Sequence, residues 1–141
     1  MRLAPLLLLL LCACEEQATA PLLADNIVIT EAIPGQTMSA GFMTLRNNSN
    51  EAIEIDAVRS TEFAAVAIHE SSIENGIARM RPLKTLTIAA RSHIALQRGG
   101  IHLMLMQPKG SGQSGDDISL SFYSGETLLL ELTTQFSRGN Q

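Results

Sequence analysis

Residues 62–83 read EFAAVAIHESSIENGIARMRPL and carry the strongest local fold signal in this chain of 141 residues. Asn75-Gly76 at the centre of this stretch favours a two-residue type I′ β-turn, and the flanking segments are rich in aliphatic residues. The alanines of the first segment are also compatible with a helix, but the turn that follows them favours a β-hairpin. The stretch therefore predicts two antiparallel strands.

The turn also predicts the register of this hairpin. With Asn75-Gly76 as the two turn residues, Ser71 lies opposite Met80, and His69 lies opposite Pro82. His69 and Met80 then share a face as diagonal neighbours, with backbones about 7–8 Å apart, a gap that long side chains can close onto one ion. The hairpin thus places an imidazole and a thioether together.

The rest of the chain repeats the pattern of short apolar runs separated by Gly, Pro, Asn or Ser. With the hairpin, this pattern predicts seven to nine short strands and no helix longer than two turns. Such spacing is typical of an all-β, antiparallel β-sandwich of Greek-key type. The further expected strands lie in NIVITEA (26–32), MSAGFMTLRN (38–47), AIEIDAVRS (52–60), LTIAARSHIALQ (86–97), IHLMLMQ (101–107), ISLSFY (118–123) and TLLLELTTQF (127–136).

The run IHLMLMQ contains a second pair of candidate metal ligands. Its period of two puts His102, Met104 and Met106 on one face, and Leu103 and Leu105 on the other, which we expect to face the core. Met106 lies further toward the strand end, so we expect it to support the site and not to bind the metal.

The remaining histidine and two further methionines serve as internal comparisons. His93 has no methionine two residues away and is expected to be a surface residue. Met38 and Met43 lie in an apolar strand and are expected at the core or its rim, with Met43 the more deeply buried. A single His or Met in a strand is more often an ordinary structural residue than a ligand. The argument for a metal site therefore depends on the combination of His69, Met80, His102 and Met104.

The first fourteen residues, MRLAPLLLLLLCAC (1–14), resemble an export signal that ends in a bacterial lipobox. Arg2 supplies the positive start, and the apolar run that follows is too short to span a membrane as a helix. We expect lipidation of Cys14 and a membrane-anchored lipoprotein of the periplasm, with cleavage before Cys12 or ordinary secretion as alternatives. Residues 15–25 are then expected to form a tether.

Composition limits the kinds of partner. The net charge is −4, charged residues make up 17% of the chain, and only two lysines are present, so we expect no nucleic-acid binding. The chain is long enough for one domain, expected at residues 26–136 and followed by a short tail at 137–141. No nucleophile–base pair, carboxylate pair or phosphate loop accompanies the candidate ligands, so we expect no enzymatic activity.

The candidate ligands select a type of metal. If Cys14 is acylated, the mature domain has no thiol, which excludes a thiolate site and a blue-copper centre. Two thioethers and two imidazoles form a soft, neutral set of the kind that prefers Cu(I), whereas zinc seldom takes Met and hard ions prefer oxygen. The predicted ligands of Cu(I) are His69, Met80, His102 and Met104.

These four residues follow the pattern H-x10-M-x21-H-x-M, which resembles the signature of the periplasmic copper chaperones of the PCu(A)C family. HESSIENGIARMRPL (69–83), GGIHLMLM (99–106) and GFMTLRNNS (41–49) are similar to the family's hairpin, ligand strand and early strand. The resemblance implies a cupredoxin-like sandwich that carries Cu(I) near its surface and delivers it to the dinuclear copper centre of cytochrome c oxidase subunit II. The tail SRGNQ (137–141) lacks the His and Met residues that some relatives carry there.

Two alternatives remain open at the level of the sequence. The same ligands would suit a protein that buffers or stores periplasmic copper without a dedicated acceptor. A metal-free β-sandwich lipoprotein that acts in adhesion or assembly is the other alternative.

Overall fold

The computed structural model describes residues 20–32, 35–110 and 113–137, and these residues form strands and turns without a helix. The predicted export segment, Cys14 and residues 15–19 of the predicted tether lie outside this part of the chain. No helix in the described part is long and apolar enough to cross a membrane. The strands are β1 (Leu22–Thr30), β2 (Met38–Asn47), β3 (Ile53–Ile55), β4 (Ala57–Arg59), β5 (Phe63–Glu74), β6 (Ile77–Leu83), β7 (Leu86–Ile88), β8 (His93–Leu96), β9 (Ile101–Pro108), β10 (Asp117–Ser124) and β11 (Thr127–Ser137).

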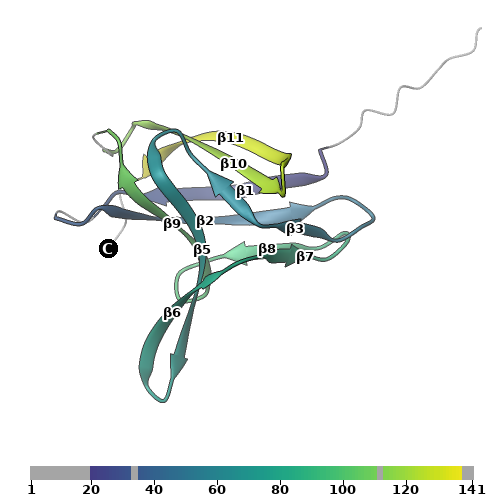
Figure 1. Cartoon of the computed structure of the whole chain (residues 1–141), viewed down its shortest axis with the longest axis horizontal. Helices are drawn as coiled ribbons and strands as arrows, with labels where there is room; N and C mark the ends of the chain where they lie inside the picture. The colour runs from purple at the N-terminus through teal and green to yellow at the C-terminus, as the bar shows by residue number, and fades with distance from the viewer. Residues whose placement is uncertain (1–19, 33–34, 111–112, 138–141) are drawn as a thin grey trace, which may run out of the picture.

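Seven of these strands close into a barrel-like ring. They pair in the order β1-β11-β10-β4-β5-β9-β2, and β2 returns to pair with β1. Strands β6 and β8 extend the sheet from β5 and β2, while β3 and β7 form a small separate sheet (Figure 1). The predicted all-β, cupredoxin-like class is confirmed. One pairing departs from a purely antiparallel sandwich, because β1 runs parallel to β11 where Ile29 lies opposite Phe136.

Alternating strand residues build the core inside this ring. Leu103 and Leu105 of β9 are fully buried, as their alternation with the candidate ligands predicted. Gly41 of β2 lies opposite Leu103, and a Cβ at position 41 would come within 3.1 Å of the Leu103 Cβ. The absence of a side chain at Gly41 therefore allows β2 and β9 to lie close together under the outer face.

The first strand begins earlier than predicted. The sequence placed the tether at residues 15–25 and the domain from residue 26, but β1 starts at Leu22, which is fully buried. The predicted boundary between the tether and the first strand falls between Asp25 and Asn26. In the structure it lies at a β-bulge, where the register with β2 shifts between Asp25 and Val28 and Asn26 has a φ of 53°.

Two predicted strands are each divided in two, which is why the described residues form eleven strands and not seven to nine. The run 52–60 breaks at Asp56, whose carboxylate accepts a hydrogen bond from the Gly125 amide at 2.8 Å. The run 86–97 breaks around Arg91, where φ is 54° and the Arg91 amide donates to the Ser49 carbonyl at 3.1 Å. Both breaks depend on contacts with distant segments.

Candidate metal centre

The hairpin of β5 and β6 has the predicted register. Ser71 lies opposite Met80 and His69 opposite Pro82. Asn75 and Gly76 have φ angles of 53° and 77°, as a type I′ turn requires. Beyond residue 70, β5 pairs with β6 but no longer with β9, so the two strands project from the barrel (Figure 1).

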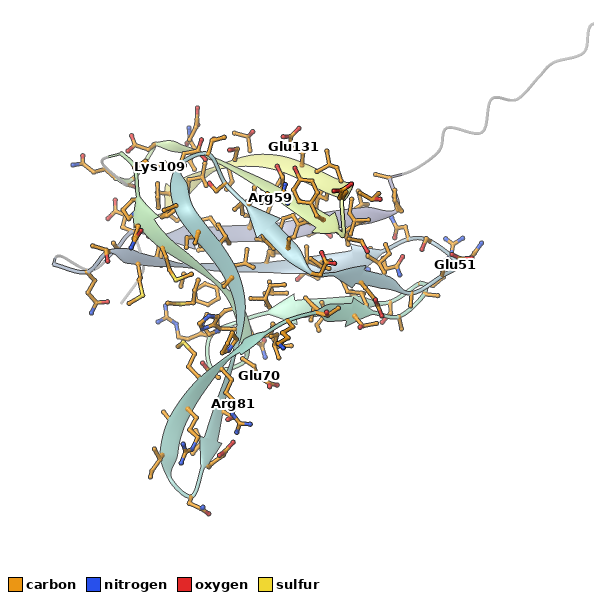
Figure 2. The ribbon with its side chains drawn as sticks, in the orientation of Figure 1. Glu51, Arg59, Glu70, Arg81, Lys109 and Glu131 are labelled. Carbon is orange, nitrogen blue, oxygen red and sulfur yellow. The ribbon has the colours of Figure 1, made fainter. Side chains whose placement is uncertain are left out.

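We call this projecting part, residues 71–80, the finger. Glu74 near its tip forms ion pairs with Arg79, at 3.1 Å, and with Arg81. Figure 2 shows Glu70 and Arg81, which pair across the two strands, at its base. The finger carries Met80, whose side chain is 52% exposed.

Strand β9 lies between β2 and β5 and brings the other candidate ligands together. His102 lies directly opposite His69, and Met104 lies opposite Ala67 on β5 and Ala40 on β2. Residues opposite each other in an antiparallel pair share a face, and this face is the outside of the barrel, since the alternate residues of β9 fill the core. The barrel therefore sets His69, His102 and Met104 side by side.

The two imidazole rings are close enough to share an ion. Their centroids lie 6.3 Å apart, with an angle of 60° between the ring planes. Metal–nitrogen bonds are about 2 Å long, so small side-chain rotations would let one ion contact nitrogens of both rings.

A backbone carbonyl fixes the tautomer of His102. Its Nδ1 lies 3.0 Å from the carbonyl oxygen of Gly100, and because a carbonyl only accepts, Nδ1 must carry the proton. The lone pair is then on Nε2. Metal-binding histidines commonly use such a hydrogen bond to fix ring orientation and tautomer. His102 is only 5% exposed, so this orientation is fixed in a packed environment.

His69 has a buried nitrogen that lacks a partner. Its Nδ1 is shielded from solvent and finds no hydrogen-bond partner within residues 20–32, 35–110 and 113–137. Such buried polar atoms are rare because they lose their hydration without replacement. Burial lowers the pKa of His69, and the neighbouring His102 lowers it further. Both effects favour the neutral imidazole, the form that binds a metal.

Three further groups contact this site although the sequence did not indicate them. The Phe42 ring packs against His102 with centroids 6.3 Å apart, and the Arg98 guanidinium lies 5.6 Å from the Phe42 centroid. The Gly100 carbonyl is the third group. The Gly-Gly pair before the ligand strand was the sequence signal that could have indicated Gly100. The positions of Phe42 and Arg98 near the site depend on the pairing of β2 with β9.

The comparison residues behave as expected. His93 is exposed on β8, where it lies opposite Arg46. Met43 is 2% exposed and Met38 is 43% exposed, so Met43 is in the core and Met38 is at the rim. Met106 is half-buried on the same outer face as Met104.

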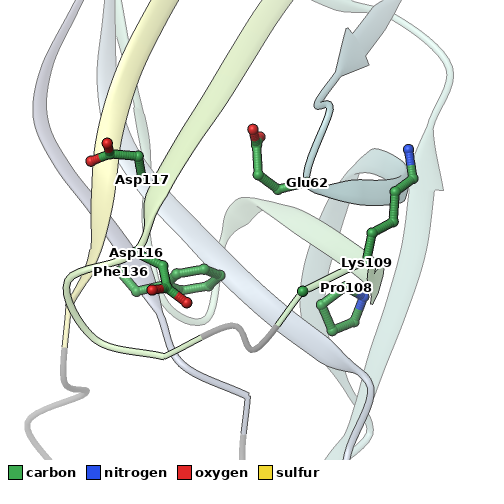
Figure 3. A pocket seen from close by; sticks show the side chains of 7 residues that line it. Glu62, Pro108, Lys109, Asp116, Asp117 and Phe136 are labelled. Carbon is green, nitrogen blue, oxygen red and sulfur yellow. The ribbon is translucent and has the colours of Figure 1, made fainter.

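Within the described part of the chain, no group of three or more His, Cys, Asp and Glu side chains could hold an ion. A separate cavity of about 250 Å³ lies between the start of β5 and the start of β10 (Figure 3). Its lining includes Glu62, Lys109, Asp117 and Phe136, and it contains neither a candidate histidine nor a methionine.

Comparisons with known proteins identify the family. Residues 22–133 match the family described as "Putative lipoprotein LpqE-like". The chain therefore belongs to this family. "Putative lipoprotein Lxx21020" of Leifsonia xyli subsp. xyli is 31% identical over 110 residues, which cover 74% of this chain. The match spans 66% of that relative, just under two thirds of its length.

Solved structures, among them a PCuAC domain, share the fold of this chain. The solution structure of CuI-DR1885 from Deinococcus radiodurans aligns with a TM-score of 0.70 and 23% identity, covering 91% of this chain and 85% of that one. The copper-bound PCuAC domain from PmoF2 aligns with a TM-score of 0.65 and 15% identity, covering 86% of this chain and 94% of that one.

Proposed function

We propose that this protein is a metallochaperone that carries Cu(I) as its cargo, bound by His69, Met80, His102 and Met104. The observation that carries the proposal is the direct pairing of His69 with His102, in which the buried Nδ1 of His69 has no partner in the described structure. A bound ion would supply that partner.

The thioethers complete the ligand set. Met104 is two residues from His102 on the same face of β9, and Met80 is diagonal to His69 across the hairpin. Two imidazoles and two thioethers are soft and neutral, which favours Cu(I) over zinc or hard ions. The descriptions of the PmoF2 domain and of CuI-DR1885, which share this fold, name bound copper and support the choice of metal.

The position of the site suits transfer and not long-term retention. It lies on the outer face of the barrel, and Met80 on the finger is 52% exposed. An incoming ligand from a partner could replace Met80 first and the more buried His102 last. We take the dinuclear copper centre of cytochrome c oxidase subunit II as the acceptor, as the resemblance to the copper chaperones implies.

The proposed location is the periplasmic face of a membrane. The export segment 1–14 ends at Cys14, where lipidation would anchor the chain. The family description and the name of the Leifsonia relative both refer to lipoproteins, which supports this anchor. Thioethers do not form disulfides and do not titrate, so the site would keep its ligands in this oxidising compartment.

Anaerobic titration with Cu(I) against a chelator tests binding, and mixing with the apo copper domain of subunit II tests delivery. We expect tight uptake of one ion into the four-ligand site, followed by transfer to the oxidase domain. A protein that does not compete with the chelator would overturn the proposal. Tight binding without transfer would instead support copper buffering. His93→Ala, a change outside the ligand set, should behave like the wild type in both assays.

A further inference from the structure

A second pair of methionines lies on the outer face beyond Met104. Met38 of β2 is directly opposite Met106 of β9, two positions along from the pair of Ala40 and Met104. Residues directly opposite in an antiparallel pair have Cβ atoms about 4.5–5.5 Å apart. A methionine side chain has three rotatable bonds. The two sulfur atoms can therefore turn toward the same ion.

The residues beside this pair are small. Ala65 of β5 lies opposite Met106, and Ala40 and Ala67 lie on either side of Met104. Methyl groups at these three positions leave the longer thioether side chains uncovered.

The contrast between two methionines of β2 supports access from solvent. Met38 is 43% exposed, whereas Met43 on the same strand is 2% exposed and belongs to the core. A methionine that only filled the apolar core would be buried, as Met43 is. The exposed thioether of Met38 is available to a soft ion.

A cavity of about 210 Å³ lies between Met38, one member of this pair, and Met104 of the candidate metal centre. Both Met38 and Met104 line it, together with Phe42, which packs on His102. Glu31 and Arg98 also line the cavity, and their opposite formal charges leave no net positive charge against a cation.

We infer that Met38 and Met106 form an accessory thioether site for Cu(I), through which the ion enters or leaves the four-ligand site by way of Met104. This inference rests on the proposed function, because Met104 is one of the proposed ligands. Two neutral thioethers select the same soft ion but offer fewer donors than the main site, so the ion should be held more weakly and exchange faster. The ion passes from these thioethers to Met104 and then to the other ligands of the four-ligand site by ligand exchange, which needs no change of oxidation state.

Anaerobic Cu(I) titration of protein with 13C-labelled methionine methyl groups tests this inference. The methyl signals of Met80 and Met104 should shift with the first equivalent, and those of Met38 and Met106 with a weaker second one. The wild type should then take up about two ions, and Met38→Leu/Met106→Leu about one, with the first affinity unchanged. Met43→Leu, the same substitution at a core position, should still take up about two ions.

Unshifted Met38 and Met106 signals in the wild type, under excess Cu(I), would overturn the inference without any need for a variant. A His69→Gln/Met80→Leu variant separates the two proposals, with a thermal melt to check its fold. If Met38 and Met106 still respond there while the first, tight equivalent is lost, both proposals stand. If the tight equivalent survives in that variant, the four-ligand assignment fails, whatever the accessory pair does.

Discussion

At the scale of single residues, the candidate site is prepared by backbone and aromatic contacts. The Gly100 carbonyl fixes the proton of His102 on Nδ1, and the Phe42 ring packs against the same imidazole. The buried Nδ1 of His69 has no hydrogen-bond partner among the described residues. His102 is thus oriented by the protein alone, whereas the buried nitrogen of His69 would gain its partner from the ion.

Met104→Leu should remove Cu(I) affinity while preserving the fold. Leucine has a similar volume, and the core face of β9 is formed by Leu103 and Leu105, so the free energy of unfolding should fall by less than about 1.5 kcal/mol. Leucine offers no lone pair, so the apparent Cu(I) affinity should fall by at least about tenfold. Chelator competition and thermal melts measure the two effects.

Met106→Leu is the matched comparison on the same strand. It should leave the first Cu(I) affinity at the wild-type value, because Met106 lies opposite Ala65 and not beside the histidines. If Met106→Leu loses the first ion and Met104→Leu retains it, the ligand of the main site is Met106.

The candidate ligands could be predicted from sequence because local rules place them. A two-residue turn fixes which residues of the two hairpin strands lie opposite each other. A strand period of two fixes which side chains of β9 share a face. Phe42 could not be predicted, since it reaches His102 only through pairing of segments about sixty residues apart, and Arg98 enters through its contact with Phe42.

At the scale of elements, the finger is the least supported part of the site. Residues 72–74 of β5 pair only with β6 among the described strands, and Ile73 and Ile77 near the tip are 79% and 59% exposed. Isolated two-stranded ribbons are marginally stable in water. The position of Met80 therefore depends on the turn and on the ion pairs of Glu74.

Gly76→Ala should weaken the finger and spare the barrel. A Cβ at position 76 meets nothing within 4 Å, so the cost comes from the φ of 77° and is about 1 kcal/mol. We expect faster hydrogen exchange in β6, a modest loss of Cu(I) affinity and an almost unchanged thermal midpoint. The amide hydrogens of β6 should exchange more slowly in Gly76→Asn than in Gly76→Ala, because Asn tolerates a left-handed backbone. Equal exchange in Gly76→Ala and the wild type would contradict this account.

The elements that sequence reasoning missed share one cause. The early start of β1, the break at Asp56 and the break around Arg91 are each stabilised by partners far along the chain. The buried side chain of Asn47 shows the same effect, since it donates to the carbonyl of Ile88, 41 residues along the chain, at 3.0 Å. A polar residue that reads locally as a strand end can thus hold two strands together.

At the scale of the whole molecule, closure of the ring places the site on a rigid surface. β2 and β5 flank β9 on its two sides, and each belongs to the barrel, so the ligand face is supported at both edges. Glu62, just before β5, forms a further connection within the ring. Its carboxylate accepts hydrogen bonds from the Ser119 amide at 2.9 Å and from the Ser60 hydroxyl at 2.8 Å. Figure 3 shows the side chain of Glu62. Glu62 therefore links the start of β5 to β10.

This link predicts an acid-sensitive contribution to the stability of the domain. Burial raises the pKa of Glu62, but hydrogen bonds from Thr61, Ser119 and Ser60 outweigh it and lower the pKa from 4.5 to about 2. The unfolded chain therefore binds the proton more readily than the folded chain between these values. The stabilisation is complete above pH 4.5 and is lost as the pH falls toward 2. Because the group is partly exposed and screened by solvent, the stabilisation amounts to on the order of 1 kcal/mol.

Glu62→Gln should therefore be less stable than the wild type at pH 7, and the difference should shrink as the pH falls from 4.5 to 2. Urea unfolding across this range measures it, and subtracting the two curves removes the carboxyls that both proteins share. Ser60→Ala deletes one donated hydrogen bond, so the pKa of Glu62 should rise toward its ordinary value and the loss of stability should begin at a higher pH. Parallel curves for Glu62→Gln and the wild type would mean that this carboxylate does not tie β5 to β10. Cu(I) affinity at neutral pH should be unchanged in both variants, because Glu62 lies outside the ligand face.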